Sequence, residues 1–291
     1  MVRIMATKKE QNNRTEKRRK GPDKPLKGKV IAITRPEKQA KKMATLIKNH
    51  GGRPLIVPTI EIKPNKNLNE IVQKIMERGE KYDFIIFTSA NGANLFIDTL
   101  IQLTGENYSN FFKDAKIIAI GSKTAKEIED RGISVDIVPK NFTSEGVIVT
   151  LKRFVSFKAR ALLPRASNVP PTLKKGLENL GIIVEEIPVY TIAKPKNETK
   201  IKNLVKAVIN GKIDIITFTS SLTAINLLET AKKENLLKQF KHAINKEKTL
   251  TVVAIGPITQ KTLEDNGIEV HLTPKKQTIE SMIKLIVHHK Y

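Results

Sequence analysis

The sequence predicts an α/β fold built from two similar units, each a doubly wound parallel sheet. The first observation is an internal repeat, because residues 117–148 align without gaps on 252–283 and 15 of these 32 positions are identical. The second is that short runs rich in valine and isoleucine alternate with amphipathic stretches. Continuous apolar strands between helices are typical of parallel sheets that are covered on both faces.

The repeat extends over most of the chain. Residues 83–96 match 214–227, and residues 30–62 correspond to 160–192. In the last pair Arg35 aligns with Arg165. The protein is therefore expected to contain two copies of one unit.

Within a unit the pattern predicts the elements in order. Apolar runs predict strands at 30–34, 84–88, 117–121 and 135–139. Amphipathic stretches predict helices at 36–52 and 122–132, and both end in glycine, as helix C-termini often do. Since open parallel sheets bind ligands at the carboxyl ends of their strands, we expect the site there, in a cleft between the two units.

Composition excludes several classes of protein. The 291 residues are 40% hydrophobic and 28% charged, and their longest apolar runs are strand-sized, so neither a membrane span nor a secretory signal is predicted. Cysteine is absent, and the five histidines have no metal-ligand spacing, so a metal site is not expected. We expect a cytoplasmic protein without a metal.

The chain is strongly basic, with a formal net charge of +23. Residues 1–27 hold ten basic and three acidic side chains and no sustained apolar pattern, so they are predicted to be a disordered basic tail. The other +16 belongs to the folded part. Such a charge favours an anionic partner, although lysines solvated in a basic cytoplasm explain it equally well.

Hydroxyl side chains stand where the predicted strands end. They can cap helices, and the same corners leave backbone N–H groups free to hold a carboxylate or phosphate. GxGxxG, GxxxxGK[ST] and GxSxG are all missing, so dinucleotide, Walker-type nucleotide and hydrolase sites are not expected. The residues concerned are Thr88, Ser89, Ser122, Thr124, Thr219, Ser220 and Thr259.

An ordered series of short motifs resembles the uroporphyrinogen-III synthase family. No single motif is decisive, but their order along about residues 29–289 is specific. The series is TRP (34–36), PTIEI (58–62), FTSANG (87–92), AIGSKTA (119–125), VPKNFTSEG (138–146), LLPRA (162–166), PVYTI (188–192), FTSS (218–221) and AIGPITQ (254–260).

The resemblance implies how the units are connected. Two α/β domains would be joined by a two-stranded β-ladder, and the first strand and helix would belong with the C-terminal half. The first domain would then comprise 28–57 plus 193–291, and the second 63–187. Residues 58–62 and 188–192 would form the ladder.

The implied reaction is the cyclisation of hydroxymethylbilane, a linear tetrapyrrole with eight carboxylates, with loss of water. The last pyrrole ring is inverted through a spiro intermediate to give uroporphyrinogen III, whereas the free bilane closes spontaneously to isomer I. This hydro-lyase reaction needs no cofactor. The resemblance also leaves room for transient contact with the preceding pathway enzyme, and a monomer is expected.

By resemblance, Tyr190 would assist departure of the substrate hydroxyl, although an aromatic packing role in the ladder is the alternative. Asn91 stands where many relatives have an arginine. The other matching positions would bind substrate: Arg35, Thr88, Ser89, Asn91, Ser122, Thr124, Arg165, Thr219, Ser220 and Thr259. Ion pairing at the surface explains either arginine equally well.

Two alternative functions remain. A tetrapyrrole-sensing regulatory protein of the same fold is one, but no second functional domain and an intact Tyr190 argue against it. A basic nucleic-acid-binding protein is the other. Four tyrosines, ten phenylalanines and no tryptophan make a base-stacking surface improbable.

Overall fold

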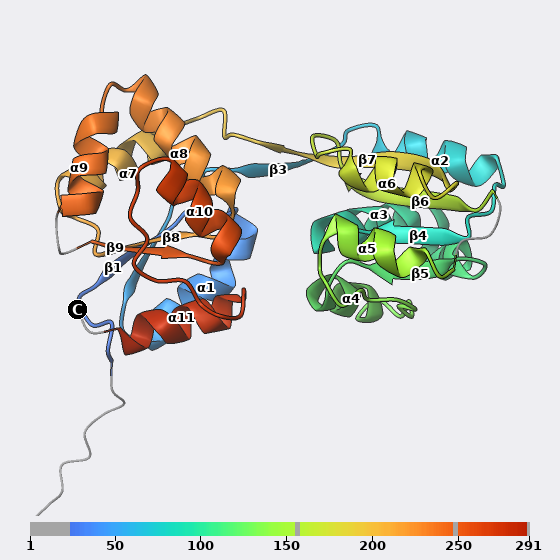
Figure 1. The fold of residues 1–291 in the computed structure, drawn as a ribbon, viewed down its shortest axis with the longest axis horizontal. Coiled ribbons are helices and arrows are strands. Elements are labelled where there is room, and N and C mark those ends of the chain that lie inside the picture. Colours follow the sequence, from blue (N-terminus) through green and yellow to red (C-terminus); the bar gives the residue numbers. More distant parts are fainter. Residues whose placement is uncertain (1–23, 155–157, 247–249, 290–291) are drawn as a thin grey trace, which may run out of the picture.

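The computed structural model describes residues 24–154, 158–246 and 250–289, which form two lobes joined by extended chain (Figure 1). Each lobe is built on one sheet. We define lobe A as the described residues of 24–60 and 194–289, and lobe B as those of 61–193. Figure 1 shows lobe A on the left and lobe B on the right, with β3 and β7 running between them.

The sheet of lobe A has four strands, all of them parallel. In spatial order they are β2 (Arg53–Ile56), β1 (Val30–Ile33), β8 (Ile215–Phe218) and β9 (Thr251–Ala254). Six helices accompany this sheet: α1 (Glu37–Asn49), α7 (Thr199–Ile209), α8 (Ser221–Lys233), α9 (Leu237–Lys246), α10 (Pro257–Asp265) and α11 (Ile279–His288).

The sheet of lobe B has five strands. The first two strands in the spatial order below pair antiparallel, and the other neighbouring strands are parallel. In spatial order they are β3 (Glu61–Pro64), β7 (Ile183–Ala193), β6 (Arg160–Ala166), β4 (Phe84–Phe87) and β5 (Lys116–Ala119). The helices of this lobe are α2 (Leu68–Glu77), α3 (Ala90–Thr104), the 3-10 helix η1 (Gly105–Phe112), α4 (Ser122–Glu129), α5 (Ser144–Leu151) and α6 (Thr172–Glu178).

The two sheets confirm the predicted fold class, because their parallel strands follow the same plan. The order β2-β1-β8-β9 in lobe A corresponds to β7-β6-β4-β5 in lobe B. The first strand and helix of the chain lie with its C-terminal half. Apolar side chains of each strand point alternately to two cores, so Ile85 and Phe87 lie in one cluster and Phe84 and Ile86 in another. Both sheets are therefore covered on both faces.

The structure differs from the sequence prediction at three places. Residues 1–23 of the predicted tail lie outside the described residues, but Leu26 is fully buried and its N–H donates to the His50 carbonyl at 3.0 Å. The run at 135–139 forms only a single bridge, from Ile137 to Ile118. Residues 188–192 belong to the second half of the long strand β7. The antiparallel pairing joins Tyr190–Ala193 of this strand to Glu61–Pro64 of β3, so it starts later on the first segment than predicted.

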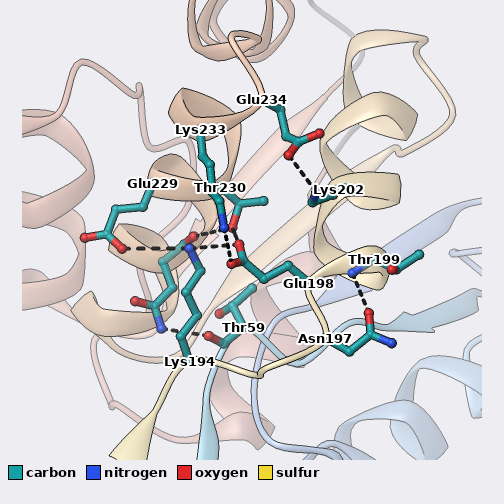
Figure 2. Close-up of polar contacts among 11 residues, drawn as sticks. Thr59, Lys194, Asn197, Glu198, Thr199, Lys202, Glu229, Thr230, Lys233 and Glu234 are labelled. Atoms are coloured by element: carbon teal, nitrogen blue, oxygen red, sulfur yellow. Dashed lines mark hydrogen bonds and ion pairs between the residues drawn. The ribbon is translucent and has the colours of Figure 1, made fainter.

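Both extended segments are fastened to lobe A where they enter it. Thr59, just before β3, donates its hydroxyl to the Thr223 carbonyl of α8 at 2.9 Å, and its own carbonyl accepts from the Asn226 side-chain amide at 2.7 Å. Lys194, just after β7, pairs with Glu198 at 3.0 Å (Figure 2). The helix that begins at the FTSS motif therefore also holds the connection between the lobes.

Glu198 is the centre of the polar cluster in Figure 2. Its carboxylate accepts from Thr230 at 2.8 Å and pairs with Lys194 at 3.0 Å and Lys233 at 3.2 Å. Partial burial raises the pKa of this carboxyl, but the hydrogen bonds from Lys194, Thr230 and Lys233 outweigh that effect and lower the pKa to about 2. The ionised form is therefore favoured by folding.

Glu198→Gln is expected to lower the free energy of unfolding by about 1–2 kcal/mol at pH 7, since the lost bonds are charge-assisted. A carboxyl whose folded pKa lies below its unfolded value stabilises the protein above the unfolded value. The difference between wild type and variant should therefore shrink as the pH falls from about 5 to 2. Urea unfolding at several pH values measures it. Glu229→Gln, which removes an exposed carboxylate 3.9 Å from Lys194, is the control and should change little.

Among the described residues, no helix is both long enough and apolar enough to cross a membrane.

Candidate functional site

The carboxyl-terminal edges of the two sheets face each other across the boundary between the lobes. Gln39 in the first turn of α1 donates its side-chain amide to the Asn91 side-chain oxygen, in the first turn of α3, at 3.1 Å. Both helices follow the carboxyl end of a strand in their own lobe. Glu280 at the start of α11 is held by Lys42, and it is near enough to Lys123 of α4 for that lysine also to lower its carboxyl pKa. We call these two edges the facing edges.

Serines at the facing edges cap the two helices that follow the FTS motifs. The Ser89 hydroxyl accepts from the Gly92 N–H at 3.0 Å, and the Ser220 hydroxyl accepts from the Thr223 N–H at 3.4 Å. The sequence allowed these hydroxyls to cap helices, and in each Thr-Ser pair of the two FTS motifs the serine does so. The neighbouring Thr88 and Thr219 are half-buried and cap nothing.

Tyr190 lies on β7, with its ring in the core of lobe B and 5% of the residue exposed. Its hydroxyl is 3.0 Å from the Ser89 hydroxyl. The packing role and the polar role are therefore not exclusive, because the ring packs while the hydroxyl reaches a facing edge. Two hydroxyls carry two protons, and their mutual bond uses one. The pair therefore has one proton left for a further acceptor. Ser89 also accepts from the Gly92 N–H, which does not use this proton.

The helices after the two glycine turns begin without a side-chain cap. Gly121 precedes α4 and Gly256 precedes α10, and neither N-cap residue has a side chain to bond the first-turn N–H groups. Uncapped N–H groups and the positive end of a helix dipole attract anions. Ser122 is exposed in the first turn of α4, whereas Thr124 and Thr259 are 5% exposed.

Several predicted hydroxyls are available for a ligand. Within the part of the chain that the structure describes, no protein group bonds the side-chain hydroxyls of Thr88, Thr124, Thr219 and Thr259. These are repeat-related pairs, two from each lobe. Hydroxyls, N–H groups and a guanidinium on facing edges would together suit a ligand with several carboxylates.

The two arginines differ although they occupy equivalent positions of the repeat. Arg165 is 6% exposed, and it donates to Glu186 at 3.0 Å and to the Pro170 carbonyl at 2.9 Å. This internal pairing explains Arg165, so the structure does not bring it to the candidate site. Arg35, just after β1, is half-buried and donates to the Gln39 side-chain oxygen at 2.8 Å. Burial lowers its pKa from the usual value.

Gln39, which joins Arg35 to Asn91, was not predicted from the sequence. It lies in a lysine-rich stretch of α1, where the pattern indicates a solvated helix face. Its repeat partner could not single it out either, since the two copies diverge in this helix. Within the described ranges no group of three or more histidine, aspartate and glutamate side chains could hold a metal ion.

Comparison with known proteins identifies relatives over most of the chain. The family model described as "Uroporphyrinogen-III synthase HemD" matches residues 41–284. A protein of Methanothermobacter thermautotrophicus named "Putative uroporphyrinogen-III synthase" is 33% identical over 87% of this chain and 95% of its own length. The uroporphyrinogen-III synthase of Chlorobaculum parvum is 26% identical over 85% of this chain and 93% of its own length.

Solved structures share the fold. A mutant uroporphyrinogen III synthase from the extremely thermophilic bacterium Thermus thermophilus superposes with a TM-score of 0.63 and 19% identity, covering 88% of this chain and 96% of the other. The synthetase of Helicobacter pylori has a TM-score of 0.55 at 18% identity, covering 89% and 98%. At such identities the likeness concerns the fold alone.

Proposed function

The chain belongs to the uroporphyrinogen-III synthase family, and from this premise we propose that it cyclises hydroxymethylbilane to uroporphyrinogen III with inversion of the last pyrrole ring. The observation that carries this proposal is the hydroxyl pair of Tyr190 and Ser89, 3.0 Å apart at a facing edge. The pair retains one proton for donation. The reaction begins with departure of a hydroxyl group, which leaves more easily as water than as hydroxide.

In the proposed mechanism Tyr190 assists this departure. The Ser89 hydroxyl donates a hydrogen bond to the Tyr190 oxygen, so the Tyr190 proton points to the substrate hydroxyl. Tyr190 gives this proton to the leaving hydroxyl as the C–O bond breaks, water is released, and the substituted carbon of the last ring attacks the carbon left behind. The resulting spiro intermediate opens and recloses through the unsubstituted α-carbon of the last ring, so that the ring is inverted. The proton that this carbon loses returns to the Tyr190 oxygen.

Specificity depends on holding the bilane in the conformation that favours this attack. The substrate has eight carboxylates. Within the described residues, the facing edges offer four threonine hydroxyls without a hydrogen-bond partner, two helix N-termini without a side-chain cap, and Arg35. We propose that these groups bind carboxylates from both lobes at once. Arg165 is not in this set because Glu186 already pairs with it.

The test is an isomer assay. Hydroxymethylbilane is generated in situ, the purified protein is added, and the oxidised products are separated by chromatography. Isomer III should predominate over the isomer I that forms without enzyme. Isomer I at the level of the protein-free control, from protein whose circular dichroism shows an intact fold, would refute the proposed activity.

A further inference from the structure

Arg35 has no carboxylate partner among the described residues, although its repeat-equivalent Arg165 has one. Arg165 pairs with Glu186 at 3.0 Å, and both arginines keep a buried Nε without a hydrogen-bond partner in the described part of the chain. Arg35 instead donates to the neutral amide oxygen of Gln39. A carboxylate is a much stronger hydrogen-bond partner for a guanidinium than an amide is. A ligand carboxylate in place of the Gln39 oxygen would therefore give Arg35 a stronger bond.

Gln39 uses both ends of its amide. The oxygen accepts from Arg35 at 2.8 Å in lobe A, and the nitrogen donates to Asn91 at 3.1 Å in lobe B. A single side chain therefore connects the guanidinium of Arg35 with the opposite lobe. A ligand carboxylate that took the place of the Gln39 oxygen on Arg35 would remove one of the two bonds that hold this side chain, and so would loosen its contact with Asn91.

We propose that Gln39 is a positioning residue that couples carboxylate binding at Arg35 to the contact between the lobes. In the ligand-free protein it bridges Arg35 and Asn91. A substrate carboxylate then displaces it from Arg35, and the lobes are released to adjust around the bilane. This inference rests on the proposed function for the identity of the ligand, whereas the ligand-free bridge does not depend on it.

Gln39→Glu tests the competition. The new carboxylate would give Arg35 an internal partner like the one that Arg165 has, so the KM for hydroxymethylbilane should rise about tenfold while kcat changes little. Gln102→Glu introduces the same charge at an exposed position of α3 and is the control. Equal increases of KM in both variants would overturn the proposal, since they would reflect net charge alone.

Gln39→Met tests the bridge without any catalysis. The chain has no cysteine, so Lys232→Cys and Glu106→Cys, at exposed positions of the two lobes, can carry a dye pair. The ligand-free distance distribution should be broader in the Gln39→Met variant than in the protein that keeps Gln39. Uroporphyrin III, a stable octacarboxylate, should broaden the distribution only where Gln39 is kept. Identical ligand-free distributions would overturn the bridge, even if the isomer assay succeeds.

Discussion

Replacing Tyr190 with phenylalanine is expected to lower kcat for hydroxymethylbilane about 100-fold, because the departing hydroxyl loses its proton donor. The ring is packed in the core of lobe B and remains, so the fold should persist with a loss of about 1 kcal/mol from the bond to Ser89. As the enzymatic reaction slows, spontaneous closure competes, and the share of isomer I should increase. Steady-state rates and product ratios measure both effects.

Tyr82→Phe is the matched control for that experiment. Its hydroxyl donates to Glu185 at 2.6 Å, and its ring is 5% exposed in the same core, but it precedes β4 and so lies at the opposite edge of the sheet. The two substitutions remove the same atom from equally buried rings. A wild-type kcat in Tyr190→Phe, or an equal loss in Tyr82→Phe, would contradict the role proposed for Tyr190.

The order of the parallel strands could be predicted from the sequence because one order has to fit both copies of the repeat. Each lobe needs four parallel strands, and the alignment of 30–62 with 160–192 assigns β1 and β2 of lobe A to the places of β6 and β7 in lobe B. A continuous apolar run also predicted β4, and the repeat placed β8 and β9 at positions equivalent to β4 and β5. Every residue of β4, β8 and β9 is buried. These features depend on local pattern, which a sequence contains in full.

Features that depend on a distant partner could not be predicted. Leu26 is a single apolar side chain in a basic segment, and its burial against lobe A leaves no periodic signal. The contacts of Arg165 are decided by Glu186, and those of Gln39 by Asn91, 52 residues away. Residue type and order predicted which groups lie at the strand ends, but only the three-dimensional arrangement decides which of them are already paired.

Phe96→Ala is expected to destabilise lobe B by about 3–5 kcal/mol. Phe96 is fully buried on α3, and its ring contacts those of Phe87, Phe111 and Phe112 at centroid distances of 6.1, 5.5 and 6.4 Å. Truncation removes the apolar contact and leaves a cavity among rings that cannot all move inward. Because Ser89 caps α3 and Asn91 lies in its first turn, the same loss should loosen the facing edge of lobe B.

Urea unfolding monitored by tyrosine emission reports mainly on lobe B and so measures this effect. Three of the four tyrosines lie in lobe B, and the protein has no tryptophan to mask them. Phe154→Ala, which truncates a ring that is 47% exposed, should cost less than about 1 kcal/mol. If Phe96→Ala cost no more than Phe154→Ala, the aromatic cluster would not be what holds α3 on the sheet. The position of Ser89 beside Tyr190 would then need another cause.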